Sequence, residues 1–209
     1  MLARTHFGDL QFLHAMASEK DELASVTHRR VIVWAEFAWR VGTGEYGLDT
    51  PLKEVPIEAF GAFFGDSGMN VQDLFTLGNN SLRPHIREVA FGSLLHVVQD
   101  SFARGHVDRA EPVDGATCEA DLGARLAPGR IREFHIYVGQ DGGKHAEYDS
   151  RDAFSAHWTL HKPDAIDVGQ ALLQQFGAGG TWDAVRPYLE CVFAVEDPDS
   201  KASLGAAFQ

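Results

Sequence analysis

Residues 91 to 109 read Phe-Gly-Ser-Leu-Leu-His-Val-Val-Gln-Asp-Ser-Phe-Ala-Arg-Gly-His-Val-Asp-Arg, and the interpretation of the chain starts from this stretch. His96 and Asp100 lie four residues apart in an apolar segment, which places them one turn apart on one face of a predicted helix. Gly105 is a typical helix stop, and His106 after it can fold back toward that face. Imidazole and carboxylate groups that converge in this way suit a cation of the zinc class. The alternative is a core helix with one polar stripe.

Two further short motifs strengthen the metal interpretation. His145 and Asp149 repeat the four-residue spacing in the segment His-Ala-Glu-Tyr-Asp, and His6 and Asp9 lie near the start in Thr-His-Phe-Gly-Asp. Each motif alone is weak, because a histidine and an acid four residues apart often occur by chance. Together with the apolar helix they predict a site for more than one metal ion.

The composition is that of a globular protein. The chain has 209 residues, of which 44% are hydrophobic and 23% charged, enough for one large domain or two small ones with a sizeable core. Its formal net charge of -12 argues against binding to nucleic acid or to an anionic membrane through a broad positively charged surface. This charge does not exclude an enzyme that binds phosphate through metal ions, because the ions supply positive charge locally.

Targeting and redox signals in the sequence are sparse. No stretch approaches the ~20 apolar residues of a transmembrane helix, and the first residues lack the layout of a signal peptide. We expect a cytoplasmic protein as the chain stands, or a secreted or periplasmic one if it is a mature form or a fragment. Cys118 and Cys191 could pair, but two cysteines make no disulfide framework, and free thiols are the expectation.

Hydrophobic periodicity predicts helices over most of the chain. The predicted helices cover residues 9–18, 25–42, 55–64, 70–77, 84–103, 145–160, 165–177 and 181–194. Between and after them we expect a long loop over 107–130, a short strand or extended segment over 131–138, and a poorly ordered tail over 200–209. Because no strand alternates with these helices in βαβ fashion, the predicted fold class is all-α, a multi-helix bundle with long loops. It is expected to form one metal-binding domain over residues 1–209.

The motifs resemble those of the zinc-dependent phospholipase C and single-strand-specific nuclease superfamily. The stretch from Gly92 to His106 is similar to the family's central motif, a glycine and then His, three residues, Asp, five residues, His. The segment from His145 to Asp149 resembles its downstream motif of His, three residues and an acid, and residues 5–9 resemble its upstream His-Phe-x-Asp. The resemblance covers roughly residues 5–160. It implies an all-helical fold with a trinuclear zinc site, in which residues 43–83 are an insertion.

The resemblance also implies a ligand set. One zinc ion would be held by His6, His96 and Asp100, and a second by His106, His145 and Asp149. The family's third zinc uses an N-terminal tryptophan and a nearby histidine, which have no counterpart here because the matching region begins almost at Met1. We therefore expect two zinc ions, and either the chain is a fragment without the family's N-terminal part, or its start is mis-assigned, or the third site differs from that of the family. The third ion is either absent or completed by other residues.

Paired metal ions can deprotonate a shared water, which then attacks a phosphorus atom in line. Asp100 is expected to act at the reacting centre as well as to bind metal. Asp9 is a second candidate catalytic acid that could orient water or substrate, with a helix-cap role as the alternative.

Other polar residues near the motifs have weaker signals. Gln99 and Tyr148 could orient metal ligands, with packing or a surface position as the alternative. Arg104 and Arg109 could contact a phosphate, with solvent exposure as the alternative. His157 and His161 have the spacing of metal ligands but no acid on the same predicted face, and His14 could approach the cluster from a position two turns beyond His6. Ordinary polar positions are expected for His28, His85 and His135.

These observations favour a zinc-dependent phosphodiesterase that resembles phospholipase C. The substrate would be a phosphodiester or phospholipid, with nucleic acid possible but not favoured by the charge. The competing hypothesis is a metal-stabilised helical domain without catalytic activity that serves as a binding or structural module. A third hypothesis is a helical protein that binds no metal.

Overall fold

The computed structural model describes residues 2–118, 125–158 and 161–208, without the side chains of residues 2, 3 and 158. The α-helices are α1 (Leu2–Phe7), α2 (Ala24–Gly42), α3 (Gly61–Phe64), α4 (Val71–Thr76), α5 (Ile86–Asp100), α6 (Gly142–Tyr148), α7 (Arg151–Trp158), α8 (Ala165–Gly177) and α9 (Trp182–Val192). Short 3-10 helices are η1 (Gln11–His14), η2 (Leu52–Glu54), η3 (Asn80–His85) and η4 (Ala206–Phe208). The strands are β1 (Val107–Arg109), β2 (Thr117–Cys118), β3 (Arg125–Leu126) and β4 (Ile131–Phe134).

The prediction of an all-α fold is wrong. About 52% of the chain is helical, but antiparallel strand pairs accompany the nine described helices, so the fold is mixed α/β. β1 pairs with β4, with Val107 opposite Phe134, and β2 pairs with β3. Three of these strands lie where the sequence predicts a long loop. Strands of two to four residues are too short for an alternating pattern to show in a sequence.

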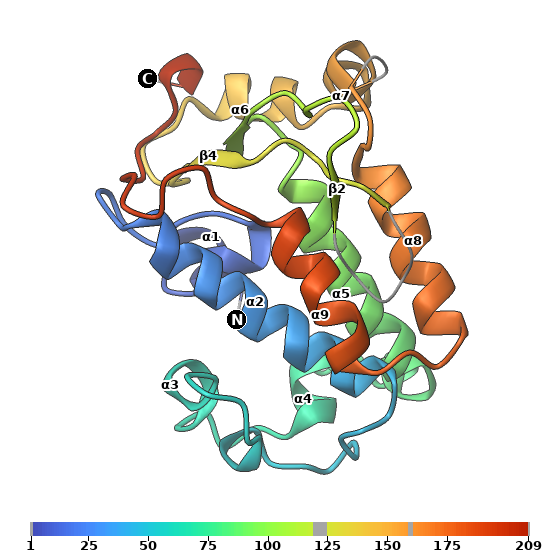
Figure 1. Ribbon diagram of the computed structural model, residues 1–209. Helices are drawn as coiled ribbons and strands as arrows, with labels where there is room; N and C mark the ends of the chain where they lie inside the picture. Colours follow the sequence, from blue (N-terminus) through green and yellow to red (C-terminus); the bar gives the residue numbers. More distant parts are fainter. Residues whose placement is uncertain (1, 119–124, 159–160, 209) are drawn as a thin grey trace.

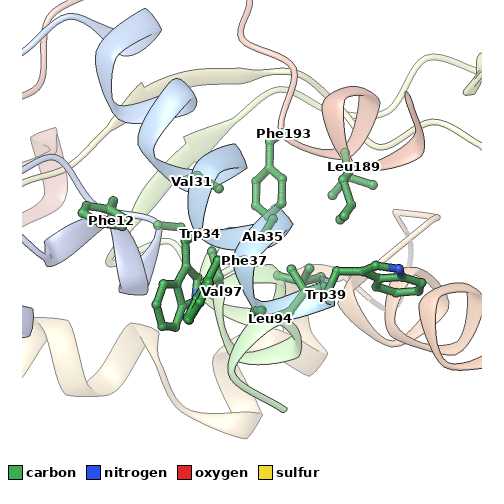
Figure 2. Close-up of a cluster of buried hydrophobic side chains, with 14 of the residues drawn as sticks. Phe12, Val31, Trp34, Ala35, Phe37, Trp39, Leu94, Val97, Leu189 and Phe193 are labelled. Carbon is green, nitrogen blue, oxygen red and sulfur yellow. The ribbon is translucent and has the colours of Figure 1, made fainter. Parts of the chain in front are cut away.

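Helices α2 and α5 form the centre of the molecule (Figure 1). They pack against each other, while α9 lies against α2 and α8 against α5. The buried face of α2 includes Val31, Trp34, Ala35 and Ala38, the face that the periodicity indicates. Figure 2 shows this face meeting side chains of α5 and α9. Burying each large apolar side chain in such a core contributes about 1.5–3 kcal/mol to folding.

Several predicted helices differ from the observed ones in extent. The helix expected over residues 9–18 is replaced by the short η1, preceded by α1. The helix expected over residues 55–64 is reduced to α3. The one expected over 145–160 is divided into α6 and α7, and residues 159 and 160 lie outside the described part of the chain.

Residues 43–83, which the resemblance marks as an insertion, pack into the same core as the central helices. In Figure 1, α3 and α4 lie at the end of the molecule opposite α6 and α7. The ring centroids of Phe37 and Phe60 are 4.3 Å apart, and those of Trp34 and Phe64 are 6.1 Å apart. The aromatic residues of this segment thus complete one end of the core.

The tail, expected to be poorly ordered, is packed over most of its length. Ala202 exchanges backbone hydrogen bonds of 2.9 Å with the chain near Glu22, and Ser203 forms a bridge with His135. Phe208 is 2% exposed, and its ring centroid lies 5.1 Å from that of Tyr148. The chain end therefore covers part of the region that carries the second histidine motif. Gln209 lies outside the described residues.

The expectation of free cysteines is also wrong. Cys118 on β2 and Cys191 on α9 form a disulfide that spans 73 residues of sequence. The spacing of two cysteines carries no information about which elements the fold brings together, so the pairing could not be chosen from sequence. Among the described residues, none of the helices combines the length and the apolar character needed to cross a lipid bilayer.

Candidate metal centre

Six side chains from three parts of the chain converge at one end of α5. His96 and Asp100 lie in the last two turns of that helix, and His106 follows it before β1. The remaining three are His14 at the end of η1, His145 on α6 and Asp149 directly after α6. They form two groups of three, in each of which one ligand atom from every residue lies within 4.8 Å of those from the other two.

The first group is built around the carboxylate of Asp100. Its Oδ2 atom lies 2.9 Å from His14 Nδ1 and 3.2 Å from His96 Nε2, and these two nitrogens are 3.0 Å apart. A tetrahedral zinc ion with bonds of ~2.0–2.1 Å holds its ligand atoms roughly 3.3 Å apart. The separations in this group are therefore close to those of a metal site. The His96 side chain is 51% exposed, so the group is open on one side.

His14 joins His96 and Asp100 in place of His6, the residue that the resemblance implies for this group. The His6 ring lies beside His14, with centroids 4.7 Å apart, and its Nδ1 atom is 2.9 Å from Thr5 Oγ1. None of the three groups of described residues that could hold a metal ion includes His6. The chain turns at Ala15, which has a φ of 51°, directly after His14. Such a local turn is not visible in the spacing of the histidines.

The second group is deeper. Asp149 Oδ2 lies 3.1 Å from His106 Nε2 and 2.9 Å from His145 Nε2, and the His106 side chain is only 7% exposed. Because Asp100 Oδ2 is also 3.7 Å from His106 Nδ1, the carboxylate of Asp100 lies between the two groups. The structure thus brings together the three residues that the resemblance assigns to a second zinc ion.

Hydrogen bonds outside the second group fix both of its imidazoles. His106 Nδ1 donates to the carbonyl of His14 at 2.7 Å, and His145 Nδ1 donates to Gln140 Oε1 at 2.6 Å. Both rings therefore direct Nε2 toward Asp149, where it donates a hydrogen bond to the carboxylate and, after loss of that proton, could bind a metal ion, an arrangement typical of metal-binding histidines. Gln140 is itself held by donating to the carbonyls of Gly105 and Leu204. No sequence pattern indicates a role for Gln140, because a glutamine in a turn has no distinguishing spacing.

The electrostatics of the second group keep the carboxylate of Asp149 ionised. Burial alone would raise the pKa of Asp149, but hydrogen bonds from His106 and His145 lower it far below its usual range. Burial opposes the charge on His106, yet Asp149 and Asp100 raise its pKa above the ordinary value. For His96 burial prevails over the attraction of Asp100, and the pKa is lowered. A cation bound here would replace the proton that these carboxylates favour on His106.

A cleft of about 760 Å³ opens beside the two groups. His96, Asp100 and Asp149 line one side of it. Its other walls include the apolar side chains Phe102, Phe154 and Ile166 and the cation Arg104. The Arg104 guanidinium lies 5.1 Å from the centroid of the Tyr148 ring, which supports it at the cleft wall. Gln99 and Tyr148 also line the cleft.

Other predicted residues lie elsewhere. Asp9 pairs with Arg4 at 2.6 Å, and this hydrogen bond lowers the Asp9 pKa. Arg109 is buried and donates to the carbonyls of Ser101, Gly129 and Val192, so neither a phosphate contact nor a solvated surface position is correct for it. These two side chains are satisfied by the protein itself.

A third group combines Glu111 with His157 and His161, of which His157 lines the same cleft. The described residues therefore contain three groups that could hold a metal ion. Comparison with protein-family models, with curated proteins and with solved structures finds no match. The functional interpretation consequently depends on the geometry and chemistry of these groups.

Proposed function

We propose that this protein is a zinc-dependent hydrolase of phosphodiesters, resembling phospholipase C. The observation that carries the proposal is the pair of adjacent His-His-Asp groups, linked through Asp100, at the side of a cleft that also presents Arg104. Imidazole nitrogens with one carboxylate oxygen are ligands that suit zinc better than calcium or magnesium, which prefer all-oxygen sites. Three protein ligands for each ion leave a position for water or substrate, as in catalytic zinc sites.

The residues of the cleft have complementary tasks in this proposal. His14, His96 and Asp100 would hold one ion, and His106, His145 and Asp149 the other. Bound zinc supplies a water of lowered pKa and neutralises phosphate oxygens. Arg104 is placed to pair with a phosphate oxygen, and Tyr148 keeps its guanidinium at the wall. Asp100 would orient the attacking water between the two groups.

The cleft favours a phosphodiester with an apolar substituent. Phe102, Phe154 and Ile166 offer apolar contact next to the ligands, which suits the acylated part of a phospholipid. A net charge of -12 disfavours the long polyanionic backbone of a nucleic acid. We therefore propose phospholipid head-group esters, rather than single-stranded nucleic acid, as the substrate class.

The test compares hydrolysis by the wild type and by isosteric variants. Zinc-loaded protein is assayed on bis-p-nitrophenyl phosphate and on phosphatidylcholine in mixed micelles. Asp100→Asn and Asp149→Asn are expected to lose at least about 100-fold in kcat/KM, the order of loss typical of damaged metal sites. Asp183→Asn, an exposed change on α9, serves as the matched control and retains wild-type activity. Circular dichroism checks that all three variants keep their helices.

The result also separates the two main hypotheses. Zinc bound at the wild-type stoichiometry, with no hydrolysis of either substrate, would reject the hydrolase. It would favour the metal-stabilised binding or structural module instead. Hydrolysis that persists unchanged in Asp100→Asn would show that this centre is not where the reaction occurs.

A further inference from the structure

The third group joins two segments that are distant in the sequence. Glu111 follows β1, whereas His157 lies near the end of α7 and His161 lies before α8. Glu111 Oε2 is 2.6 Å from His161 Nδ1, and Glu111 Oε1 is 3.8 Å from His157 Nε2. The two imidazole centroids are 5.1 Å apart. The sequence shows no acid on the same predicted helix face as these histidines. In the structure, Glu111 from the segment after β1 is that acid.

We propose that Glu111, His157 and His161 form a separate binding site for a divalent cation of the zinc class. One ligand atom of each residue lies within 4.8 Å of the other two, so a modest closure around an ion would bring all three into contact with it. Two imidazoles and one carboxylate form a ligand set found in zinc sites that keep an open coordination position. The site shares no residue with the pair of groups around Asp100.

The environment of this group differs from that of the group around Asp149. The side chains of His157, His161 and Glu111 are 27%, 34% and 56% exposed, so water or a solute can reach the ion's open position. Greater exposure also leaves the ligands less fixed, and this site therefore binds zinc more weakly than the groups around Asp149. Its zinc is the first to be lost on dialysis.

The position of the group gives the ion a role at the cleft. His157 lines the same cleft as His96 and Asp149, together with Phe154 and Ala153 of α7. An ion held at once by α7 and by the segment after β1 fixes the α7 wall in place. The ion also adds positive charge to a cleft that already contains Arg104. The site does not depend on the proposed hydrolysis and is tested without it.

Zinc stoichiometry tests the site directly. Untagged protein is stripped with chelator and titrated with zinc against a chromophoric competitor. The wild type is expected to bind three ions, the third more weakly, and Glu111→Gln and His161→Ala are each expected to bind two. His85→Ala, which removes an exposed histidine on η3, is the matched control and retains three. Equal stoichiometry in the wild type and in both site variants would overturn the proposal.

Amide hydrogen exchange gives a second readout that does not depend on stoichiometry. Exchange in α7 is expected to slow as zinc fills the weakest site, and this protection is absent in His161→Ala. In His145→Ala, which removes a residue of the group around Asp149, the protection of α7 by zinc is expected to remain. Zinc-dependent protection of α7 that persists in His161→Ala would also overturn the proposal, whatever the outcome of the hydrolysis assay.

Discussion

Gly105 lies so close to the second metal group that a side chain there would crowd His145 and Asp149. A Cβ atom at this position would lie 3.0 Å from His145 Nδ1 and 3.1 Å from Asp149 Oδ1. Gly105→Ala is expected to push His145 away from Gln140 and to weaken zinc binding about 10-fold, the lower end of the effect of disturbed outer ligands. Zinc affinity is measured by chelator competition.

Gly92 provides the control for this change. It lies on α5, and a Cβ atom there would meet nothing within 4 Å. Gly92→Ala is therefore expected to leave zinc affinity unchanged and to raise the free energy of unfolding by roughly 0.5–1 kcal/mol, because alanine is the better helix former. Equal zinc affinity in both variants would contradict the steric argument for Gly105.

Gln140 contributes to the centre without being a ligand. Its Oε1 atom accepts a hydrogen bond of 2.6 Å from His145 Nδ1 and so fixes the ring that faces Asp149. Gln140→Ala is expected to weaken zinc binding by about 10- to 100-fold. Gln170→Ala, on the exposed side of α8, controls for loss of a glutamine elsewhere. The idea fails if calorimetric titration gives both variants the wild-type affinity.

His28 on α2 predicts a pH dependence that is separate from the metal centre. Burial lowers its pKa below 6.5, and Glu190 only partly opposes this. The unfolded chain therefore binds more protons at this position, so the His28 contribution to stability is full above the unfolded pKa and is lost as the pH falls. Between pH 7.5 and 5.5 the wild type should lose more stability in urea unfolding than His28→Leu does. A larger loss in the variant would show that the sign is wrong.

At the scale of elements, length determines what the sequence predicts. The periodicity of α2 and α5 extends over four or more turns and predicts both helices closely. The strands β1 to β4 are too short to show any period, and their pairing depends on contacts between residues far apart in sequence. An all-α fold was the natural prediction because only the long elements leave a readable pattern.

The same distinction applies to the candidate centre. His96 with Asp100, and His145 with Asp149, are joined by helical spacing, and the structure places each pair in one group. His14 and Glu111 reach their groups through a turn at Ala15 and through the path of the chain after β1. Those contacts are tertiary, and no local pattern specifies them.

The disulfide connects two elements whose contact is likewise tertiary. Cys118 and Cys191 close a loop across a sequence separation of 73 residues and attach the β2–β3 hairpin to α9. Closing such a loop restricts the unfolded chain, which stabilises the fold by about 2–4 kcal/mol. Replacing both cysteines with alanine should lower the free energy of unfolding by that amount.

Reductant provides the control for this prediction. Dithiothreitol should lower the unfolding midpoint of the wild type and leave that of the double variant unchanged. A thiol titration of the denatured, unreduced protein should find no free cysteine. A wild type that is insensitive to reductant would contradict a stabilising disulfide.

At the scale of the whole molecule, the two ends have different sources of stability. The end with α3 and α4 is closed by aromatic packing, with Phe37, Phe60 and Phe75 in contact. The opposite end places buried histidines and carboxylates under the C-terminal tail, where Phe208 meets Tyr148. Bound cations offset the cost of collecting these polar groups, so this end is expected to depend on metal.

Removing metal should therefore destabilise the protein as a whole, because the ligands come from positions as distant as His14 and Asp149. Each ion present at 100 times its dissociation constant adds about 2.7 kcal/mol to the free energy of unfolding. Chelator should lower the thermal midpoint of the wild type by several degrees, whereas a His96→Ala/His145→Ala variant keeps only the smaller shift due to the Glu111 group. If chelator shifted both proteins equally, metal at the Asp100-linked pair would add nothing to stability. Those histidines would then have to be held in place by the fold alone.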